Sequence, residues 1–425
     1  MVVGRPWAAG DAERPRKSDF ENPPQFALVL NLSIPRVASA ASPGGQPQDS
    51  MICYIAADST TADARVALTP TTAQALTKLG LELRAPPGLG RASRYADEDY
   101  RAAGVTFTDD AAGATAVADL VLRVRKPTPA EIATMKRGAV HLSFLDPFNE
   151  AALLAAFAQA GVSAVSLEMI PRTTLAQKMD ALSSQASLAG YAAVIQAAAR
   201  LRKALPMMMT PAGTIMPARV FVLGAGVAGL QAIATAKRLG ARVEAFDTRP
   251  VVEEQVRSLG AKFVKIDVGQ TGQTAGGYAQ ALTPEQIARQ QAGMAKVCAH
   301  ADIVITTAKV FGRPAPRLVT QAMLAGMQPG SVVVDLAVDT GGNVEGSRPG
   351  EEVVTGNGVI ILGHANLEST VAAHASQVLA ANYAAWITHF WDETAKTLRL
   401  DPNDEILKGC LITHDGRIVH PQFAK

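Results

Sequence analysis

Residues 219–247 read RVFVLGAGVAGLQAIATAKRLGARVEAFD, and this stretch decides the fold of the second half of the chain. The continuous apolar run Val220–Leu223 is typical of a strand that is buried on both faces. The Ala-rich segment Leu230–Leu239 favours a helix, and Arg242–Phe246 has the pattern of a second strand. The stretch therefore predicts a βαβ unit, which implies a parallel sheet.

The turn between the first strand and the helix carries three glycines in G-x-G-x-x-G spacing. Gly224 permits a tight turn, Gly226 lets the backbone approach a pyrophosphate, and Gly229 lets the helix pack closely on the strand. Asp247 ends the second strand, where a carboxylate can accept hydrogen bonds from adenosine ribose hydroxyls. Because an acid there repels a 2′-phosphate, we expect NAD(H) rather than NADP(H), although Arg249 could in principle compensate a phosphate.

Composition narrows the remaining possibilities. The chain has 425 residues, with 40 Lys and Arg against 38 Asp and Glu, so its net charge of +2 indicates neither nucleic acid nor an acidic membrane surface as a partner. Cys53, Cys298 and Cys410 are too few and too scattered for a disulfide framework or a zinc site. We expect no metal, two α/β domains and a reducing compartment.

Two stretches free of charged side chains, Ala181–Ala199 and Ser369–Trp391, could be taken for membrane spans. Both are Ala-rich and contain Ser, Gln, Asn or His, so they are too polar to cross a bilayer. We predict two long helices buried between the domains and no direct insertion into the membrane.

The domain organisation follows from these segments. Residues 1–50 have mixed charge, several prolines and no period, which predicts a disordered N-terminal extension. Residues 51–180 together with 370–425 are expected to form a first Rossmann-like domain, and 181–369 the NAD-binding one. The expected architecture is two doubly wound parallel-sheet domains joined by long helices, with a cleft between them.

The first domain alternates strands and helices but lacks a glycine fingerprint. Thr69 and Pro70 predict the N-cap and first residue of a helix that extends to Leu79. Strands are expected at Ile52–Ala56, Asp119–Val124, Val140–Leu145 and Ala164–Leu167, with a helix over Asn149–Ala160. The alternating tail Leu411–Val419, with a turn at Asp415-Gly416, is expected to pack back on this domain.

In the second domain, further strands at Ile303–Thr307, Ser331–Leu336 and Val359–Leu362 are expected to complete the sheet. Because ligands collect at the carboxyl ends of strands in open α/β sheets, segments 307–309, 335–338 and 364–366 should lie towards the cofactor. The Gly-rich run Val268–Gln280 is too polar to pack and is a candidate lid.

The polar loop 171–180, PRTTLAQKMD, precedes the first long helix. Asp180 is well placed as the helix N-cap. Arg172 and Gln177 have no packing role that the sequence reveals.

These segments together resemble a known family. RVALTP, PRTTLAQKMDALSSQASLAGY, VFVLGAGVAGLQAIATAKRLGA, QTAGGYA, DIVITTA, GRPAP, PGSVVVDLAVDTGGN and HDGRIVHP are similar to motifs of the NAD(H)-binding component, domain I, of proton-translocating NAD(P) transhydrogenases. The resemblance covers about residues 51–423 and extends to the related alanine dehydrogenases. It implies hydride transfer, Si-specific/Re-specific, from NADH to NADP⁺.

The resemblance also implies roles for particular residues. Arg172, Gln177 and Asp180 would lie at the nicotinamide as the catalytic loop, with Gln177 between the two rings. The mobile lid would be formed by Gly277 and Tyr278. The remaining expected cofactor contacts are Lys178, Met179, Gly224, Ala225, Gly226, Val227, Gly229, Asp247, Thr248, Arg249, Gln290 and Lys309. Two positions depart from the family pattern, Leu175 in place of an Arg and Leu282 in place of a Met.

Because direct hydride transfer between nicotinamides needs no protein acid or base, the loop has to position the rings and exclude water. Arg172 and Asp180 are expected to form a charge pair that fixes it. NADP(H) would be held by a partner beta subunit, and proton flux would pass through a membrane-spanning subunit. The resemblance implies a homodimer, cytoplasmic and peripheral on the inner face of the cell membrane through these partners.

Two other functions remain open at this point. An alanine dehydrogenase-like enzyme could use Arg65 and Lys126 to clamp a substrate carboxylate. Its catalytic histidine, however, would fall at Leu142, with His141 out of register. The third possibility is an NAD-binding sensor without chemistry, against which the loop 171–180 argues.

Overall fold

The computed structural model describes residues 50–58, 63–269, 272 and 282–424. Residues 1–47 separate from the rest of the chain as a unit of their own. The predicted N-terminal extension lies outside the described residues. The fold below is that of the second unit, residues 48–425.

The first half of this unit contains a six-stranded sheet in the order β3-β2-β1-β4-β5-β6, and all its neighbouring strands are parallel. This order reverses direction between β1 and β4, as in a Rossmann fold. The strands are β1 (Ile52–Ile55), β2 (Glu82–Ala85), β3 (Val105–Phe107), β4 (Leu120–Leu122), β5 (Val140–Ser143) and β6 (Ser163–Ser166).

Both faces of the first sheet are buried, because successive side chains along each strand point to opposite sides. Leu120 and Leu122 face one hydrophobic cluster, whereas Val121 between them faces another, which includes Phe157. The helices of this half are α1 (Pro70–Leu79), α2 (Asp97–Ala102), α3 (Ala111–Val117), α4 (Pro129–Ala133) and α5 (Ala151–Ala160). The predicted start of α1 is confirmed, with Thr69 as N-cap and Pro70 as its first residue.

The second sheet has seven strands in the order β11-β10-β9-β12-β13-β15-β14. Six are parallel and repeat the reversal of the first sheet, here between β9 and β12; the edge strand β14 is antiparallel. The strands are β9 (Arg219–Leu223), β10 (Arg242–Phe246), β11 (Lys262–Phe263), β12 (Ile303–Thr306), β13 (Val332–Asp335), β14 (Glu352–Val354) and β15 (Ile360–Leu362). The chain thus has the predicted pair of doubly wound sheets.

Helices cover both faces of the second sheet. Val220 and Val222 face a cluster that contains residues of α6 (Ala181–Arg200) and α7 (Val227–Arg238). Phe221 and Leu223 face the opposite cluster, with residues of α9 (Pro284–Cys298) and α10 (Gln321–Ala325). The remaining helix, α8 (Glu253–Ser258), begins after the 3-10 turn η5 (Pro250–Val252), so the predicted helix at 251–259 is split in two.

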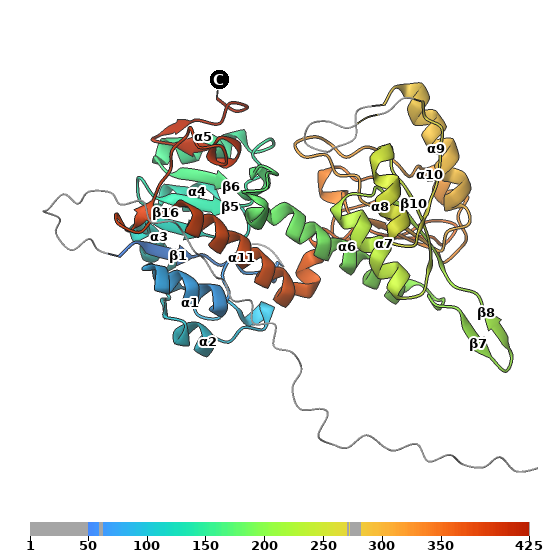
Figure 1. Cartoon of the computed structure of the whole chain (residues 1–425), viewed down its shortest axis with the longest axis horizontal. Helices are drawn as coiled ribbons and strands as arrows, with labels where there is room; N and C mark the ends of the chain where they lie inside the picture. Colours follow the sequence, from blue (N-terminus) through green and yellow to red (C-terminus); the bar gives the residue numbers. More distant parts are fainter. Residues whose placement is uncertain (1–49, 59–62, 270–271, 273–281, 425) are drawn as a thin grey trace, which may run out of the picture. The chain divides into compact units, whose positions relative to one another are not determined.

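Two long helices run between the two sheets in the sequence. One is α6, and the other is α11 (Ala372–Phe390), which follows the 3-10 turn η7 (Leu367–Val371); the two helices pack on each other (Figure 1). Gly190 makes the contact of α6 with α7 very close, since a Cβ there would lie 2.1 Å from the carbonyl oxygen of Ala228. In the described part of the chain, no helix has the length and apolar character of a membrane span.

The C-terminal tail returns to the first sheet, as predicted. Ile412 N–H donates to the Ala164 carbonyl at 2.8 Å, and Leu411 forms a bridge with Val165. The tail contains β16 (Trp391–Asp392), β17 (Thr397–Leu398), α12 (Leu407–Cys410), β18 (Thr413–His414) and β19 (Arg417–Ile418).

Candidate functional site

The turn after β9 is built from glycines that each meet a different steric demand. Gly224 has φ 99°, in the left-handed region that L side chains avoid. A Cβ at Gly229 would lie 1.9 Å from the Gly224 carbonyl oxygen, so this position cannot hold a side chain without a backbone shift. A Cβ at Gly226, by contrast, would meet no atom within 4 Å. The open space at Gly226 is what a backbone that receives a pyrophosphate requires.

Asp247 at the end of β10 closes this turn. Its Oδ2 accepts from the Ala225 backbone N–H at 2.8 Å, and its Oδ1 accepts from the Arg249 backbone N–H at 2.8 Å. The acid therefore ties the second strand to the glycine turn.

The Arg249 guanidinium also binds Asp247, with Nε at 2.9 Å from Oδ1 and Nη2 at 2.7 Å from Oδ2. These hydrogen bonds raise the pKa of Arg249 above its usual range. The cation is thus engaged with the acid, which favours a non-phosphorylated ribose beside Asp247. Thr248 between them is half-buried.

The loop 172–180 ends at Asp180, which is the N-cap of α6 as predicted. Its Oδ1 accepts from the Ser183 N–H at 2.8 Å and its Oδ2 from the Ser183 hydroxyl at 2.6 Å. Arg172 Nε lies 3.9 Å from Asp180 Oδ2, so the predicted charge pair is present. Because the Arg172 side chain is 45% exposed, this long pair guides orientation more than it adds stability.

Between these two residues, the 3-10 turn η4 (Gln177–Met179) presents its side chains in opposite directions. Gln177 and Lys178 are exposed, whereas Met179 is only 3% exposed and belongs to the core of the first half. Leu175, the departure from the family pattern, is 60% exposed. The loop thus has a buried anchor and a polar outer side, which leaves the Gln177 amide available to a ligand.

Other expected cofactor residues lie at the carboxyl ends of the second sheet. Lys309 follows β12 and its Nζ lies 2.6 Å from Asp339 Oδ2. Val227 begins α7 and is 40% exposed, whereas Ala225 is 1% exposed. Gln290 in α9 is buried, and its amide lies 3.9 Å from the Met294 sulfur. Gly277 and Tyr278, the expected lid, lie outside the described residues.

The sequence missed the hydrogen bonds that shape this edge. Asp335 is fully buried and accepts from the backbone N–H groups of Ala337, Asn343 and Val344 at 3.0–3.1 Å. The Asn343 amide in turn donates to the Ala308 carbonyl at 2.9 Å. Asp335 therefore shapes loops around the site, and buried polar residues at strand ends were its one signal in the sequence.

The groups that could clamp a substrate carboxylate are already paired. Arg65 Nη2 lies 2.6 Å from Asp63 Oδ2, and Arg65 Nη1 lies 2.9 Å from Glu368 Oε1. This guanidinium lowers the pKa of Asp63 to about 2, although burial alone would raise it. Lys126 Nζ lies 2.6 Å from Glu150 Oε1, in a partly exposed pair. Neither cation is presented to a small carboxylate as an unneutralised charge.

His141 is not placed as an acid or base. It is fully buried, its ring lies 5.1 Å from that of Phe157, and its Nε2 lies 2.9 Å from the Ser143 hydroxyl. Burial, aided by the charge of Arg123, lowers the pKa of His141 to about 3. Leu142 faces the other side of the sheet. No group of three or more metal-ligating side chains gathers in the described ranges.

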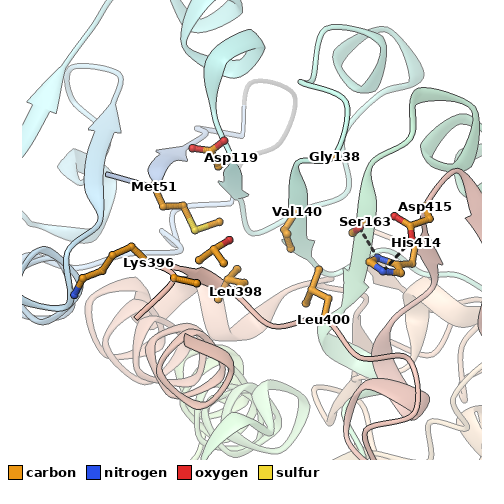
Figure 2. A pocket seen from close by; sticks show the side chains of 12 residues that line it. Met51, Asp119, Gly138, Val140, Ser163, Lys396, Leu398, Leu400, His414 and Asp415 are labelled. Carbon is orange, nitrogen blue, oxygen red and sulfur yellow. Dashed lines mark hydrogen bonds and ion pairs between the residues drawn. The ribbon is translucent and has the colours of Figure 1, made fainter. Parts of the chain in front are cut away.

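A cavity of about 410 Å³ lies near the amino ends of β4, β5 and β6 (Figure 2). Its polar groups pair with one another or with neighbours: Ser163 Oγ lies 2.9 Å from His414 Nδ1, and Asp119 Oδ1 lies 2.6 Å from Lys136 Nζ. Since this is the edge opposite to the carboxyl ends, it is not the cofactor site expected for a doubly wound sheet.

Two doubly wound sheets, a glycine turn open for a pyrophosphate and an acid at the ribose position define a dinucleotide-binding oxidoreductase of the Rossmann class. Comparison with family models is more specific. Residues 54–189 match the alanine dehydrogenase/PNT N-terminal domain, and residues 193–421 match the alanine dehydrogenase/PNT C-terminal domain. The chain belongs to this family and, within it, to the NAD(P) transhydrogenase alpha subunits, as its relatives show.

The first segment of the divided NAD(P) transhydrogenase alpha subunit of Rhodospirillum rubrum is 45% identical over 364 residues, which cover 84% of this chain and 94% of the relative. The crystal structure of transhydrogenase from Sinorhizobium meliloti superposes with a TM-score of 0.75 at 44% identity, covering 87% of this chain and 99% of that one. Alanine dehydrogenase of Halomonas elongata is more distant, at 28% identity over 85% of this chain and 92% of its own. These relationships support NAD(H) as the cofactor and imply partner subunits.

Proposed function

We propose that this chain is the NAD(H)-binding part of a proton-translocating NAD(P) transhydrogenase and passes a hydride from NADH to NADP⁺ held by another subunit. The observation that carries this proposal is the loop 172–180, whose buried Met179 holds an exposed Gln177 beside the Arg172–Asp180 pair. A dehydrogenase that encloses a small substrate would instead present an unpaired cation or an acid–base group, and Arg65, Lys126 and His141 offer neither.

The proposed chemistry needs positioning rather than proton transfer. The hydride moves directly between the C4 carbons of two nicotinamides, so the protein has to hold both rings in contact and keep water out. The Gln177 amide can donate and accept at once and would hold a carboxamide of either ring. Arg172 and Asp180 would orient the loop, and Lys178, Met179 and the glycine turn would hold the NADH. Gly277, Tyr278, Gln290 and Lys309 are proposed as further contacts.

Partners follow from the same proposal. NADP(H) would lie on a beta subunit, and the proton path on a membrane-spanning subunit. The chain would be cytoplasmic and peripheral on the inner face of the cell membrane, held there by these subunits. The domain limits 51–180 with 370–425 and 181–369 belong to the proposal.

A homodimer is also proposed, and an exposed apolar hairpin supports it. The strands β7 (Met208–Thr210) and β8 (Gly213–Ile215) form a two-stranded hairpin (Figure 1), and all six of their residues are exposed. Met209 is 83% and the adjoining Met216 72% exposed. Because a lone hairpin is marginally stable in water, and apolar patches of this kind mark contact surfaces, a second copy of the chain is a suitable partner.

The test is reconstitution with the candidate beta and membrane subunits, with NADH deuterated at either face of C4 and an NADP⁺ analogue as acceptor. We expect deuterium to move directly to the analogue, from one face only. Gln177→Leu, which removes both polar atoms of the amide, should slow this transfer while NADH still binds. A chain that binds NADH tightly but never supports transfer with its partners would refute the proposal, as would NADH oxidation with pyruvate and ammonia.

A further inference from the structure

A buried amide on α11 reaches the loop that carries Gln177. Asn382 is 7% exposed, and its Nδ2 donates to the Lys178 carbonyl oxygen at 2.8 Å. Its Oδ1 accepts from the Ser184 hydroxyl at 2.7 Å, one turn after the start of α6. One side chain thus bridges the loop and the helix that follows it, from a position 204 residues away in sequence.

The orientation of this amide is set by its neighbours. The Lys178 carbonyl can only accept, so the atom that faces it must be the nitrogen. A carboxylate at position 382 would keep the shape and the bond to Ser184 but place an oxygen against the Lys178 carbonyl. The donor, rather than the size of the side chain, is therefore the feature that the site requires.

The contact matters because η4 has little stability of its own. It is three residues long, and its Met179 N–H bonds to the nearby Ala176 carbonyl at 2.8 Å. A short 3-10 turn of this kind needs tertiary contacts to hold one orientation. The peptide that Asn382 grips joins Lys178 to Met179, directly after Gln177.

Asn382 is itself held firmly. The next residue, Tyr383, is fully buried and its hydroxyl donates to the Arg123 carbonyl beside the first sheet. Nearby on α11, the Ala375 carbonyl accepts from the Gln185 amide of α6 at 3.1 Å. The grip on Lys178 therefore transmits the position of the first sheet to the loop.

We propose that Asn382 is a positioning residue for hydride transfer: it fixes the Lys178 peptide so that the Gln177 side chain faces the nicotinamide. This inference rests on the function proposed above. A loop displaced by about 1 Å can lower the rate about a hundredfold, although no substrate contact is lost outright.

The first experiment compares Asn382→Leu with Thr413→Val in the full complex with the partner subunits. Thr413 is a matched control, since it is fully buried and its hydroxyl also makes one donated bond, to Val162 at 2.7 Å, and one accepted bond, from Ala164 at 3.0 Å. We expect Asn382→Leu to lower the rate of hydride transfer at saturating NADH at least tenfold and to change the NADH Kd less than threefold. Thr413→Val should lower Tm but leave the rate unchanged. Equal rates in the two variants would overturn the inference.

The second experiment needs no turnover. Lys178–Met179 is the sole Lys-Met sequence in the chain, so labelling Lys with ¹³C at the carbonyl and Met with ¹⁵N gives one cross-peak for this peptide. We expect Asn382→Asp to move or split that peak in the full-length chain and Thr413→Val to leave it in place. An unmoved peak in the Asp variant would overturn the inference while leaving the proposed function intact. If the peak moves but the wild-type complex transfers no hydride, the proposed function fails, and with it the role in hydride transfer inferred for Asn382.

Discussion

Gly226→Ala should weaken NADH binding while leaving the fold intact. The backbone of Gly226, at φ −80° and ψ −167°, is open to any residue, and its Cβ would meet nothing within 4 Å. Loss of glycine at an N-cap costs about 1 kcal/mol, and the stiffer unfolded chain returns about 0.4–1 kcal/mol. Stability should therefore change by less than about 1 kcal/mol.

Binding is affected differently, because the new methyl group occupies the space through which a pyrophosphate reaches the backbone. Loss of one charge-assisted hydrogen bond costs about 1.5–3 kcal/mol, which corresponds to an NADH Kd raised at least about tenfold. Titration of NADH by calorimetry and thermal unfolding measure the two effects separately.

Gly229→Ala is the matched control in the same turn. Its Cβ would lie 1.9 Å from the Gly224 carbonyl, where real contacts are not shorter than 3.0 Å, so the backbone must shift. This variant should lose about 1–3 kcal/mol of stability or more. If Gly226→Ala bound NADH as tightly as the wild type, the pyrophosphate would not lie at this turn and the reasoning would be wrong.

Three further predictions concern charged groups. Because His141 stays neutral in the folded state down to a pKa of about 3, the unfolded state takes up its proton first as the pH falls below about 6.5. His141→Leu should thus remove about 2 kcal/mol of the stability lost between pH 6.5 and 5, measured by urea unfolding; an unchanged pH profile would contradict this. Asp247→Asn releases the charge of Arg249 and should shift the Kd ratio of NADH to NADPH at least tenfold towards NADPH; a ratio equal to the wild type would exclude this role. Finally, pyruvate and ammonia should not oxidise NADH, because Arg65 and Lys126 are paired; a steady loss of absorbance at 340 nm would show otherwise.

The sequence predicted those elements whose residues have few alternatives. Thr69-Pro70 is a strong helix start, and a G-x-G-x-x-G turn between an apolar run and an Ala-rich segment fits one local structure. The strands β2 and β3 were missed because they are short and mix polar with apolar residues. The hairpin β7–β8 was missed since its methionines are exposed, which removes the buried period on which such predictions depend.

The candidate site was predictable as a set of segments but not as a network. Asp180 was identified as a cap because its partner Ser183 lies three residues away. The bonds from Asn382 to Lys178 and from Asn343 to Ala308 join residues that are 204 and 35 positions apart. A single sequence contains no signal for such pairs, since Asn is as common at exposed sites as at buried ones that act over long distances.

The helix α6 explains how the loop and the glycine turn keep a fixed relation. It begins at the Asp180 cap, and ten residues later Gly190 packs on Ala228, so about 15 Å of helix separates the two contacts. Glycine inside a helix costs about 1 kcal/mol relative to alanine, yet a Cβ here would lie 2.1 Å from the Ala228 carbonyl. A larger residue would push α7 away and move the glycine turn relative to Gln177. The cost to local helix stability is therefore the condition for holding the pyrophosphate and the nicotinamide ends of one dinucleotide in register.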